Sequence, residues 1–210
     1  MDKALNTLQY IIDKYQLKIG RHSPVEIPNM LRENLAELFN ELGFTVGAEI
    51  GVLYGAFSKQ LCEKNPNLKL YCVDPYLAYY GFLPGPPDQD AQDKIFESCK
   101  ETMAPYNHEF IRKTSIEAAK DFKDESLDFV YIDGNHDLLN VVLDITLWSP
   151  KVRKGGIIGG HDYTPCKNSS GQIIHVQEGV QAFAKAYEIK PWFIFGTFKP
   201  GNGSFMWVKK

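Results

Sequence analysis

From residue 45 onward the chain alternates short β-rich runs with helical segments, and this alternation limits its fold more than any other feature. The expected strands cover 45–51, 69–74, 107–112, 127–132 and 155–160, and the expected helices cover 55–64, 89–103, 115–122 and 137–149. Strands separated by helices of this length form βαβ units and build a mainly parallel sheet. The fold class is therefore α/β, with a doubly wound sheet.

The two ends of the chain add to this sheet in different ways. Apolar residues recur every three or four positions over 5–15 and again over 31–42, which predicts two amphipathic helices. Near the other end, the runs WFIFGTF and SFMWVKK flank the turn-rich KPGNG, so an antiparallel hairpin should complete a sheet of seven strands. We predict an N-terminal helical cap over 1–43, a candidate surface for a homo-oligomer, and one larger domain over 44–210.

Composition narrows the classes of partner. The 210 residues carry a net charge of -3 and no basic run longer than a pair, so neither nucleic acid nor an anionic membrane is an expected partner. No apolar run is long enough to span a membrane, and the start of the chain lacks the continuous apolar region of a signal peptide. The four cysteines form no C-x-x-C pair, which fits reduced thiols in a cytoplasmic protein. A small-molecule substrate is the expected partner.

A glycine turn after the first expected strand is the first sign of a ligand site. Glu49, Gly51 and Gly55 form the pattern E-x-G-x-x-x-G where that strand meets the following helix. Glycine permits a tight turn and lets a ligand approach the backbone closely. The next strand, LYCV, ends in Asp74, whose carboxylate can accept two hydrogen bonds from a ribose diol. Together these features predict a nucleoside-containing cofactor.

The acidic residue in the turn bears on which cofactor binds. A dinucleotide site has the pattern G-x-G-x-x-G and places a pyrophosphate at a helix N-terminus. Glu49 stands two positions before Gly51 and would repel a phosphate, whereas it suits a cationic ligand. A nicotinamide-dependent oxidoreductase remains an alternative only if pyrophosphate tolerates this glutamate.

At these residues the sequence resembles the class I methyltransferases that use S-adenosylmethionine, which have a Rossmann-like sheet. Their first motif is an acidic residue followed by G-x-x-x-G, and their second strand ends in an acidic ribose ligand. The resemblance implies that Glu49, Gly51, Tyr54 and Gly55 surround the methionine part of the cofactor and that Asp74 holds the ribose.

The resemblance also assigns residues beyond the first two strands. It implies that Thr114 and Ser115 contact the adenine ring and that Asp133 borders the cofactor. An equally weighted interpretation of Thr114 and Ser115 is an N-cap for the helix SIEAAKDF, and one hydroxyl can serve both purposes.

Two further strands end in groups that can carry chemistry. Asp133 and His136 follow the strand LDFVYI, and His161 and Asp162 follow KGGIIGG. Adjacent parallel strands would bring all four side chains to one rim of the sheet. Carboxylates and imidazoles that converge in this way form a divalent-cation site or an acid/base pair.

This combination is similar to O-methyltransferases that act on sugar or aromatic hydroxyls of macrolide and aminocoumarin antibiotics. Members carry D-G-D after the fourth strand and D-D-Y after the fifth. The resemblance implies a magnesium or manganese site made by Asp133, His161 and Asp162, with histidine in place of the first aspartate of D-D-Y. Asn135 stands where the family has its base, so His136 and His161 become the candidate catalytic residues.

The expected function is therefore O-methylation of a small-molecule hydroxyl with S-adenosylmethionine as the methyl donor. The departures at Asn135 and His161 leave a second hypothesis open, that of a methyltransferase-like binding subunit without catalysis. The aromatic segment 76–90 is a candidate lid, and the loop 163–172 is a candidate substrate-specificity loop.

Overall fold

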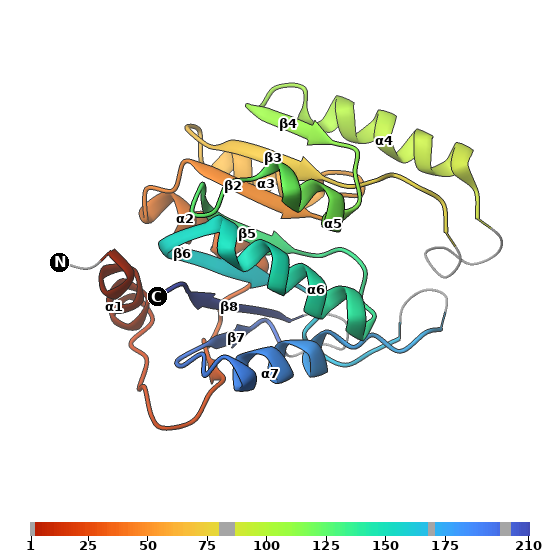
Figure 1. Ribbon diagram of the computed structural model, residues 1–210. Helices are drawn as coiled ribbons and strands as arrows, with labels where there is room; N and C mark the ends of the chain where they lie inside the picture. Colours follow the sequence, from red (N-terminus) through yellow and green to blue (C-terminus); the bar gives the residue numbers. More distant parts are fainter. Residues whose placement is uncertain (1–2, 80–86, 168–170, 198–202) are drawn as a thin grey trace.

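The computed structural model describes residues 3–79, 87–167, 171–197 and 203–210. Within these ranges the chain forms one sheet of eight strands in the order β1-β7-β8-β6-β5-β2-β3-β4, with helices on both faces (Figure 1). The predicted α/β class and doubly wound sheet are confirmed.

Five parallel strands form the larger part of the sheet. They are β2 (Val46–Ile50), β3 (Lys69–Val73), β4 (His108–Ile111), β5 (Leu127–Ile132) and β6 (Val152–Gly160). A parallel sheet covered on both faces needs apolar residues on both sides of each strand, and β2 and β5 are buried along most of their length. Each of the five predicted strands is found, with ends that differ by at most three residues.

The predicted terminal hairpin is also confirmed. β7 (Phe193–Phe195) and β8 (Ser204–Val208) pair antiparallel, and β8 is inserted between β7 and β6, antiparallel to both. Residues 199–202 of the predicted turn lie outside the described residues.

The sheet has one strand more than the seven that the sequence predicts. β1 (Val25–Glu26) pairs in parallel with β7, so that Val25 lies opposite Phe193 and Glu26 opposite Ile194. Two residues are too few to carry a detectable alternation of apolar and polar side chains, which is why the pattern missed this strand.

The helices lie close to where their apolar spacing places them. They are α1 (Lys3–Lys14), α2 (Arg32–Glu41), α3 (Ala56–Lys64), α4 (Gln89–Met103), α5 (Ser115–Ala118), α6 (Leu138–Trp148) and α7 (Val176–Ala186), with the 3-10 turns η1 (Ala119–Asp121) and η2 (Ser149–Lys151) after α5 and α6. Asp88 and Asp137 start α4 and α6 because their carboxylates accept a hydrogen bond from a backbone N–H of the first turn. None of the helices in the described ranges has the length and apolar character needed to cross a membrane.

The core consists of two apolar layers on opposite faces of the sheet. Successive side chains of a strand point to opposite faces, and β5 divides its residues accordingly. Phe129 and Tyr131 pack with residues of α1 to α4, whereas Val130 and Ile132 pack with residues of α5 to α7. The layers fix the ends of β2, β3, β5 and β6 relative to one another, and those ends carry the site.

The N-terminal helices share the core of the sheet. α1 lies against β6 and β8, and the Thr7 hydroxyl donates a hydrogen bond to the carbonyl of Gly155 (2.8 Å). α2 packs beside α3, and Ile11 and Leu35 belong to the same buried cluster as Phe129. The boundary at residue 43 between a cap and a larger domain stays a prediction.

Candidate functional site

A cavity of about 720 Å³ opens at the carboxyl ends of β2, β3, β5 and β6. Ligands of doubly wound proteins bind at this edge of the sheet. Of the predicted cofactor-binding residues, all but Gly55 line this cavity, and so do the predicted catalytic and metal-binding residues: Glu49, Gly51, Tyr54, Asp74, Thr114, Ser115, Asp133, His136, His161 and Asp162. The structure therefore brings together groups that lie far apart in the sequence.

The glycine turn has the tightness that the pattern predicts. Gly51 has φ +87°, and a Cβ at this position would lie 2.1 Å from the carbonyl oxygen of Asp133, so no other residue fits. Gly55 has φ +75° and precedes α3, where a Cβ would lie 2.9 Å from Sγ of Cys99. Gly55 thus shapes the turn from behind the cavity wall, and its predicted contact with the cofactor remains a prediction.

Asp74 ties the glycine turn to the end of β3. Its Oδ2 accepts hydrogen bonds from the backbone N–H groups of Val52 (2.9 Å) and Leu53 (3.1 Å), and its Oδ1 accepts one from Tyr76 (2.8 Å). A carboxylate has about four lone-pair sites, so a ribose hydroxyl can still donate to it. The geometry gives Asp74 a structural role beside the predicted ribose contact.

Glu49 is almost fully buried, with 2% of its surface exposed, at the inner end of the cavity. The Ser58 hydroxyl donates a hydrogen bond to its Oε2. Burial raises the pKa of Glu49 to about 8, because a carboxylate is poorly solvated there and the charge of Arg32 offsets only part of this effect. A cationic ligand would favour the charged form.

Thr114 caps helix α5, Ser115 is the first residue of that helix, and both line the cavity. The Thr114 Oγ1 accepts a hydrogen bond from the backbone N–H of Glu117 (3.3 Å) at the start of α5. The Ser115 hydroxyl accepts one from Nε1 of Trp148 (2.8 Å). The capping interpretation is thus confirmed for Thr114, and contact with adenine stays a prediction for both residues.

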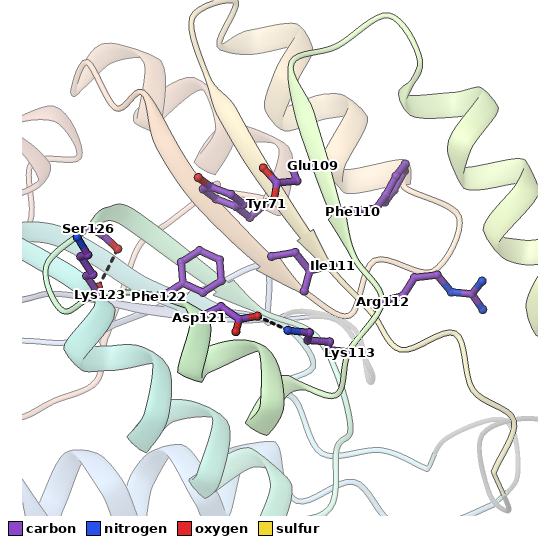
Figure 2. Close-up of a pocket in the computed structure, with 10 residues that line it drawn as sticks. All are labelled: Tyr71, Glu109, Phe110, Ile111, Arg112, Lys113, Asp121, Phe122, Lys123 and Ser126. Carbon is purple, nitrogen blue, oxygen red and sulfur yellow. Dashed lines mark hydrogen bonds and ion pairs between the residues drawn. The ribbon is translucent and has the colours of Figure 1, made fainter.

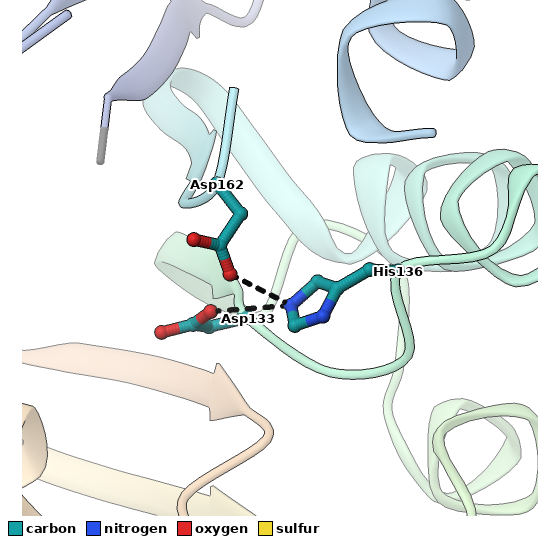
Figure 3. Close-up of side chains that lie close together, drawn as sticks. All are labelled: Asp133, His136 and Asp162. Carbon is teal, nitrogen blue, oxygen red and sulfur yellow. Dashed lines mark ion pairs between the residues drawn. The ribbon is translucent and has the colours of Figure 1, made fainter. Parts of the chain in front are cut away.

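Four side chains from the ends of β5 and β6 form the rim of the cavity. Figure 3 shows three of them, Asp133, His136 and Asp162. Nε2 of His136 lies 3.0 Å from Oδ2 of Asp162 and 3.6 Å from Oδ1 of Asp133. Nδ1 of His161 lies 3.2 Å from Oδ1 of Asp162 and 3.9 Å from Oδ1 of Asp133. Each imidazole therefore lies close to both carboxylates, as expected for adjacent parallel strands.

The rim has strong internal electrostatics. Burial lowers the pKa of His136, but the two neighbouring carboxylates outweigh this and raise the pKa to about 10. Burial raises the pKa of Asp162, and the two histidines outweigh it and hold the pKa well below its usual range. The Nε2 atom of His136 is buried and makes no hydrogen bond of acceptable geometry among the described residues. Its contact with Asp162 is therefore an ion pair in which the N–H group does not point at the carboxylate oxygen.

One set of rim atoms matches the requirements of a metal site. Ligand atoms of Asp133, His136 and Asp162 all lie within 4.8 Å of one another. The sequence predicts His161 as the third ligand beside the two aspartates, whereas this close group contains His136. Loop geometry decides which imidazole enters the group, and the sequence carries no information on it.

Sequence reasoning missed two charged residues of the cavity. Arg32, at the start of α2, donates from Nη1 to Oδ2 of Asp133 (3.1 Å) and lies over the ring of Phe57, 4.9 Å from its centre. Asp144 of α6 is 3% exposed, and burial raises its pKa to about 6. Their helices show only an apolar stripe in the sequence, which indicates burial and not which polar neighbour faces the sheet edge.

The candidate lid and the candidate specificity loop are only partly described. Tyr76 is 1% exposed, and its hydroxyl donates to the carbonyl of Leu53 (3.0 Å), so it belongs to the core and not to a lid. Tyr79 lines the cavity, whereas 80–86 and 168–170 lie outside the described residues.

A second hollow of about 600 Å³ lies beside the edge strand β4 (Figure 2). Two of its three basic side chains are paired, Lys113 with Asp121 (2.6 Å) and Arg112 with Asp93 (3.1 Å). It contains none of the predicted site residues, and the chemistry of the sequence motifs is therefore confined to the first cavity.

Residues 48–163 match the family model described as a methyltransferase domain. The chain belongs to this methyltransferase family. The matched segment begins in β2 and ends just after Asp162, so it contains the glycine turn and the rim. The resemblance to class I methyltransferases that use S-adenosylmethionine is confirmed, and the oxidoreductase alternative loses its support.

Further proteins are similar to this chain in sequence or in fold. The uncharacterized protein y4gI of Sinorhizobium fredii (strain NBRC 101917 / NGR234) is 29% identical over 100 residues, which are 48% of this chain and about a tenth of that protein. An O-methyltransferase from Bacillus cereus in complex with SAH superposes with a TM-score of 0.60 and 17% identity, over 99% of this chain and 90% of that one.

A second structure, cofactor-bound Rv0187 from MTB, has a TM-score of 0.62 and 15% identity, over 99% of this chain and 90% of that one. At these identities the likeness establishes the fold alone. The methyltransferase fold extends over both the N-terminal helices and the terminal hairpin.

Proposed function

We propose that this methyltransferase transfers the methyl group of S-adenosylmethionine to a hydroxyl of a small molecule, a sugar or an aromatic compound. One observation carries the proposal: a single cavity joins the turn at Glu49 and Gly51 and the carboxylate of Asp74 to the rim of two aspartates and two histidines. A donor and an acceptor can therefore meet within one cavity.

The donor end of this mechanism depends on the turn. The cavity is lined by Glu49, whose buried carboxylate gains stability from a positive charge nearby, and the sulfonium of the donor supplies that charge. Asp74 lines the cavity beside the turn, and its carboxylate has acceptor capacity left for a ribose hydroxyl. Catalysis then consists mainly of holding the methyl group in line with the acceptor oxygen.

The acceptor end depends on the rim. We propose that His161 takes the proton of the acceptor hydroxyl, because Nδ1 faces Oδ1 of Asp162 at 3.2 Å and Nε2 remains as the second ring nitrogen. An aspartate that orients an imidazole in this way is common in general base catalysis. His136 lies between the two carboxylates and is the positioning residue in this proposal.

The rim residues also fit a divalent cation. The buried Nε2 of His136 lacks a hydrogen-bond partner among the described residues and is flanked by oxygens of Asp133 and Asp162. We propose that these three residues would hold the ion, with manganese as suitable as magnesium because one ligand is an imidazole. A bound cation supplies charge that stabilises a developing alkoxide or phenolate.

The acceptor is proposed to be neutral or cationic and partly apolar. The lining includes four aspartates and one arginine, a balance that disfavours anionic substrates. Leu77 and Tyr79 are 53% and 43% exposed at the cavity and can pack against a sugar or an aromatic ring. These features are compatible with the macrolide- and aminocoumarin-type subgroup.

Calorimetric titration with S-adenosylmethionine followed by a methyl-transfer assay on a panel of hydroxyl compounds tests the proposal. We expect saturable binding and formation of S-adenosylhomocysteine with at least one sugar or phenol. Absence of donor binding contradicts the proposal, and donor binding without transfer to any panel member favours the non-catalytic alternative.

The cation is tested separately by thermal denaturation with added Mn²⁺ and by the assay after chelation. We expect Mn²⁺ to raise the melting temperature of the wild type and to leave that of Asp162→Asn unchanged. The control Asp121→Asn, a change in the second hollow, should respond to Mn²⁺ as the wild type does. Full activity after chelation removes the cation from the proposal and leaves the histidines.

A further inference from the structure

The cavity has one strongly basic side chain, Arg32, and this residue lies outside the segment 48–163 that matches the family. Among the described lining residues Arg32 is the only arginine or lysine. Five lining residues carry carboxylates: Glu49, Asp74, Asp133, Asp144 and Asp162. The carboxylate of a ligand is therefore repelled by the aspartates of the wall and attracted by Arg32.

Contacts with Phe57 and Asp133 hold Arg32 in place but leave several of its N–H donors without an acceptor in the described residues. Its guanidinium lies 4.9 Å from the centre of the Phe57 ring, and Nη1 donates to Oδ2 of Asp133 at 3.1 Å. A guanidinium has five N–H donors, and in the described part of the chain this is its one hydrogen bond. With 28% of the side chain exposed, the other donors remain available to a ligand in the cavity.

The neighbourhood of Arg32 also favours an anion. Ala56 and Phe57, the first residues of α3, line the cavity next to it. The N-terminal turn of a helix carries partial positive charge from its free N–H groups. The guanidinium and this turn therefore favour negative charge at the same place.

The methyl donor brings a carboxylate into a cavity that is otherwise acidic. S-adenosylmethionine ends in an amino acid with an α-carboxylate and an α-ammonium. We propose that Arg32 binds the α-carboxylate of the methyl donor, an inference that rests on the proposed function. Asp133, the partner of Arg32, then faces the α-ammonium, so that the ion pair matches the charges of the amino acid.

This assignment gives Arg32 a role in specificity. A donor without the carboxylate, such as decarboxylated S-adenosylmethionine, would offer the guanidinium no acceptor at this position. Arg32 would then add nothing to the affinity for that donor. The enzyme should therefore distinguish the two forms of the cofactor at Arg32.

Calorimetry with two product analogues tests the proposal directly. S-adenosylhomocysteine has the carboxylate, and S-adenosyl-3-thiopropylamine is the same molecule without it. We expect the wild type to bind S-adenosylhomocysteine at least about 10-fold more tightly, and Arg32→Gln to weaken that binding about 10- to 100-fold, the range of charge-assisted hydrogen bonds. The affinity for the amine should change less than about twofold in Arg32→Gln.

Arg32→Lys and Arg153→Gln complete the set. Lysine keeps the charge but not the planar fork of donors, so Arg32→Lys should recover part of the lost affinity. Arg153 also pairs with an aspartate of β5, Asp128 (2.6 Å), and lies over a phenylalanine, Phe44 (5.3 Å), but away from the cavity. Arg153→Gln should bind both analogues as the wild type does.

The outcomes separate this proposal from the proposed function. If the wild type binds neither analogue, the donor assignment itself fails. Equal weakening of both analogues in Arg32→Gln, or no weakening of either, overturns the role of Arg32 alone. Should Arg32→Gln not fold, the wild-type protein still tests the proposal. Equal wild-type affinities for the two analogues would show that the protein does not bind the carboxylate and would overturn the proposal.

Discussion

Each end of β5 has an aspartate, an arginine that pairs with it and a phenylalanine under the arginine. The two ends differ in the number of hydrogen bonds that the aspartate accepts. At one end Asp128 pairs with Arg153, which lies over Phe44. Just beyond the other end Asp133 pairs with Arg32, which lies over Phe57. The two arginines are equally exposed, at 28%, and the two aspartates nearly so, at 13% and 17%.

Hydrogen bonding separates the two ends. Asp128 accepts bonds from the backbone N–H groups of Thr45 (2.7 Å) and Val46 (2.9 Å) and from Nε of Arg153 (2.6 Å). Asp133 accepts one aligned bond, from Arg32, and otherwise faces histidines of the rim. Exposure and residue type therefore do not distinguish a structural carboxylate from one that can bind a ligand, whereas the number of occupied acceptor sites does.

The largest expected effect sharpens this comparison through activity. Asp133→Asn should lower methyl transfer about 10³-fold, because the rim loses a charge beside the reacting hydroxyl, whereas Asp128→Asn should stay within about twofold. The measurement is formation of S-adenosylhomocysteine with the acceptor found in the panel. Equal losses in both variants would remove the functional difference between the two ends.

The second prediction concerns the free energy of unfolding that is lost when the buried Glu49, at the cavity end, ionises. With a pKa of about 8, folded Glu49 keeps a proton that the unfolded chain releases above pH 4.3 or so. The free energy of unfolding should therefore fall between pH 4.5 and 8 by about 5 kcal/mol relative to Glu49→Gln, and level off above pH 8. Denaturant titrations across this range measure it, and parallel curves for the two proteins would contradict it.

A third prediction measures stability at the opposite end. Asp128→Ala leaves two backbone N–H groups and Arg153 without their acceptor and should cost about 2 kcal/mol, a drop in melting temperature of about 4–8 °C. Asp133→Ala should cost less, because it breaks one aligned hydrogen bond, from Arg32, and leaves no backbone N–H group without its acceptor. The reverse order in thermal denaturation would break the comparison.

The smallest expected effect belongs to the arginine of the satisfied end. Arg153→Gln should change the free energy of unfolding by less than about 1 kcal/mol, since the backbone N–H groups of Thr45 and Val46 still hold Asp128. Denaturant unfolding provides the measurement. A loss larger than that of Asp128→Ala would show that the arginine, and not the backbone, satisfies this aspartate.

Much of the fold and part of the site could be predicted from the sequence because local patterns determine them. The apolar runs placed five parallel strands, and the turn residues placed the antiparallel pair β7 and β8. The glycine turn and the strand ends predicted that Glu49, Asp74 and the rim residues belong to one site, because the carboxyl ends of parallel strands meet at one edge of the sheet.

The remaining features depend on contacts that no local pattern encodes. Arg32 reaches Asp133 across 101 positions, and its helix shows only an apolar stripe. The choice of His136 or His161 for the close group with the two aspartates depends on loop geometry. A two-residue strand such as β1 exists only because β7 offers it an edge.

The pairing of β1 with β7 has a consequence for biosynthesis. Val25 lies opposite Phe193, 168 positions later, and Arg32 follows β1 by six residues. On the ribosome, the segment that carries the guanidinium has no edge to pair with until β7 has been translated. The nascent chain should therefore acquire its full affinity for the methyl donor only near the end of synthesis, although the glycine turn is made early.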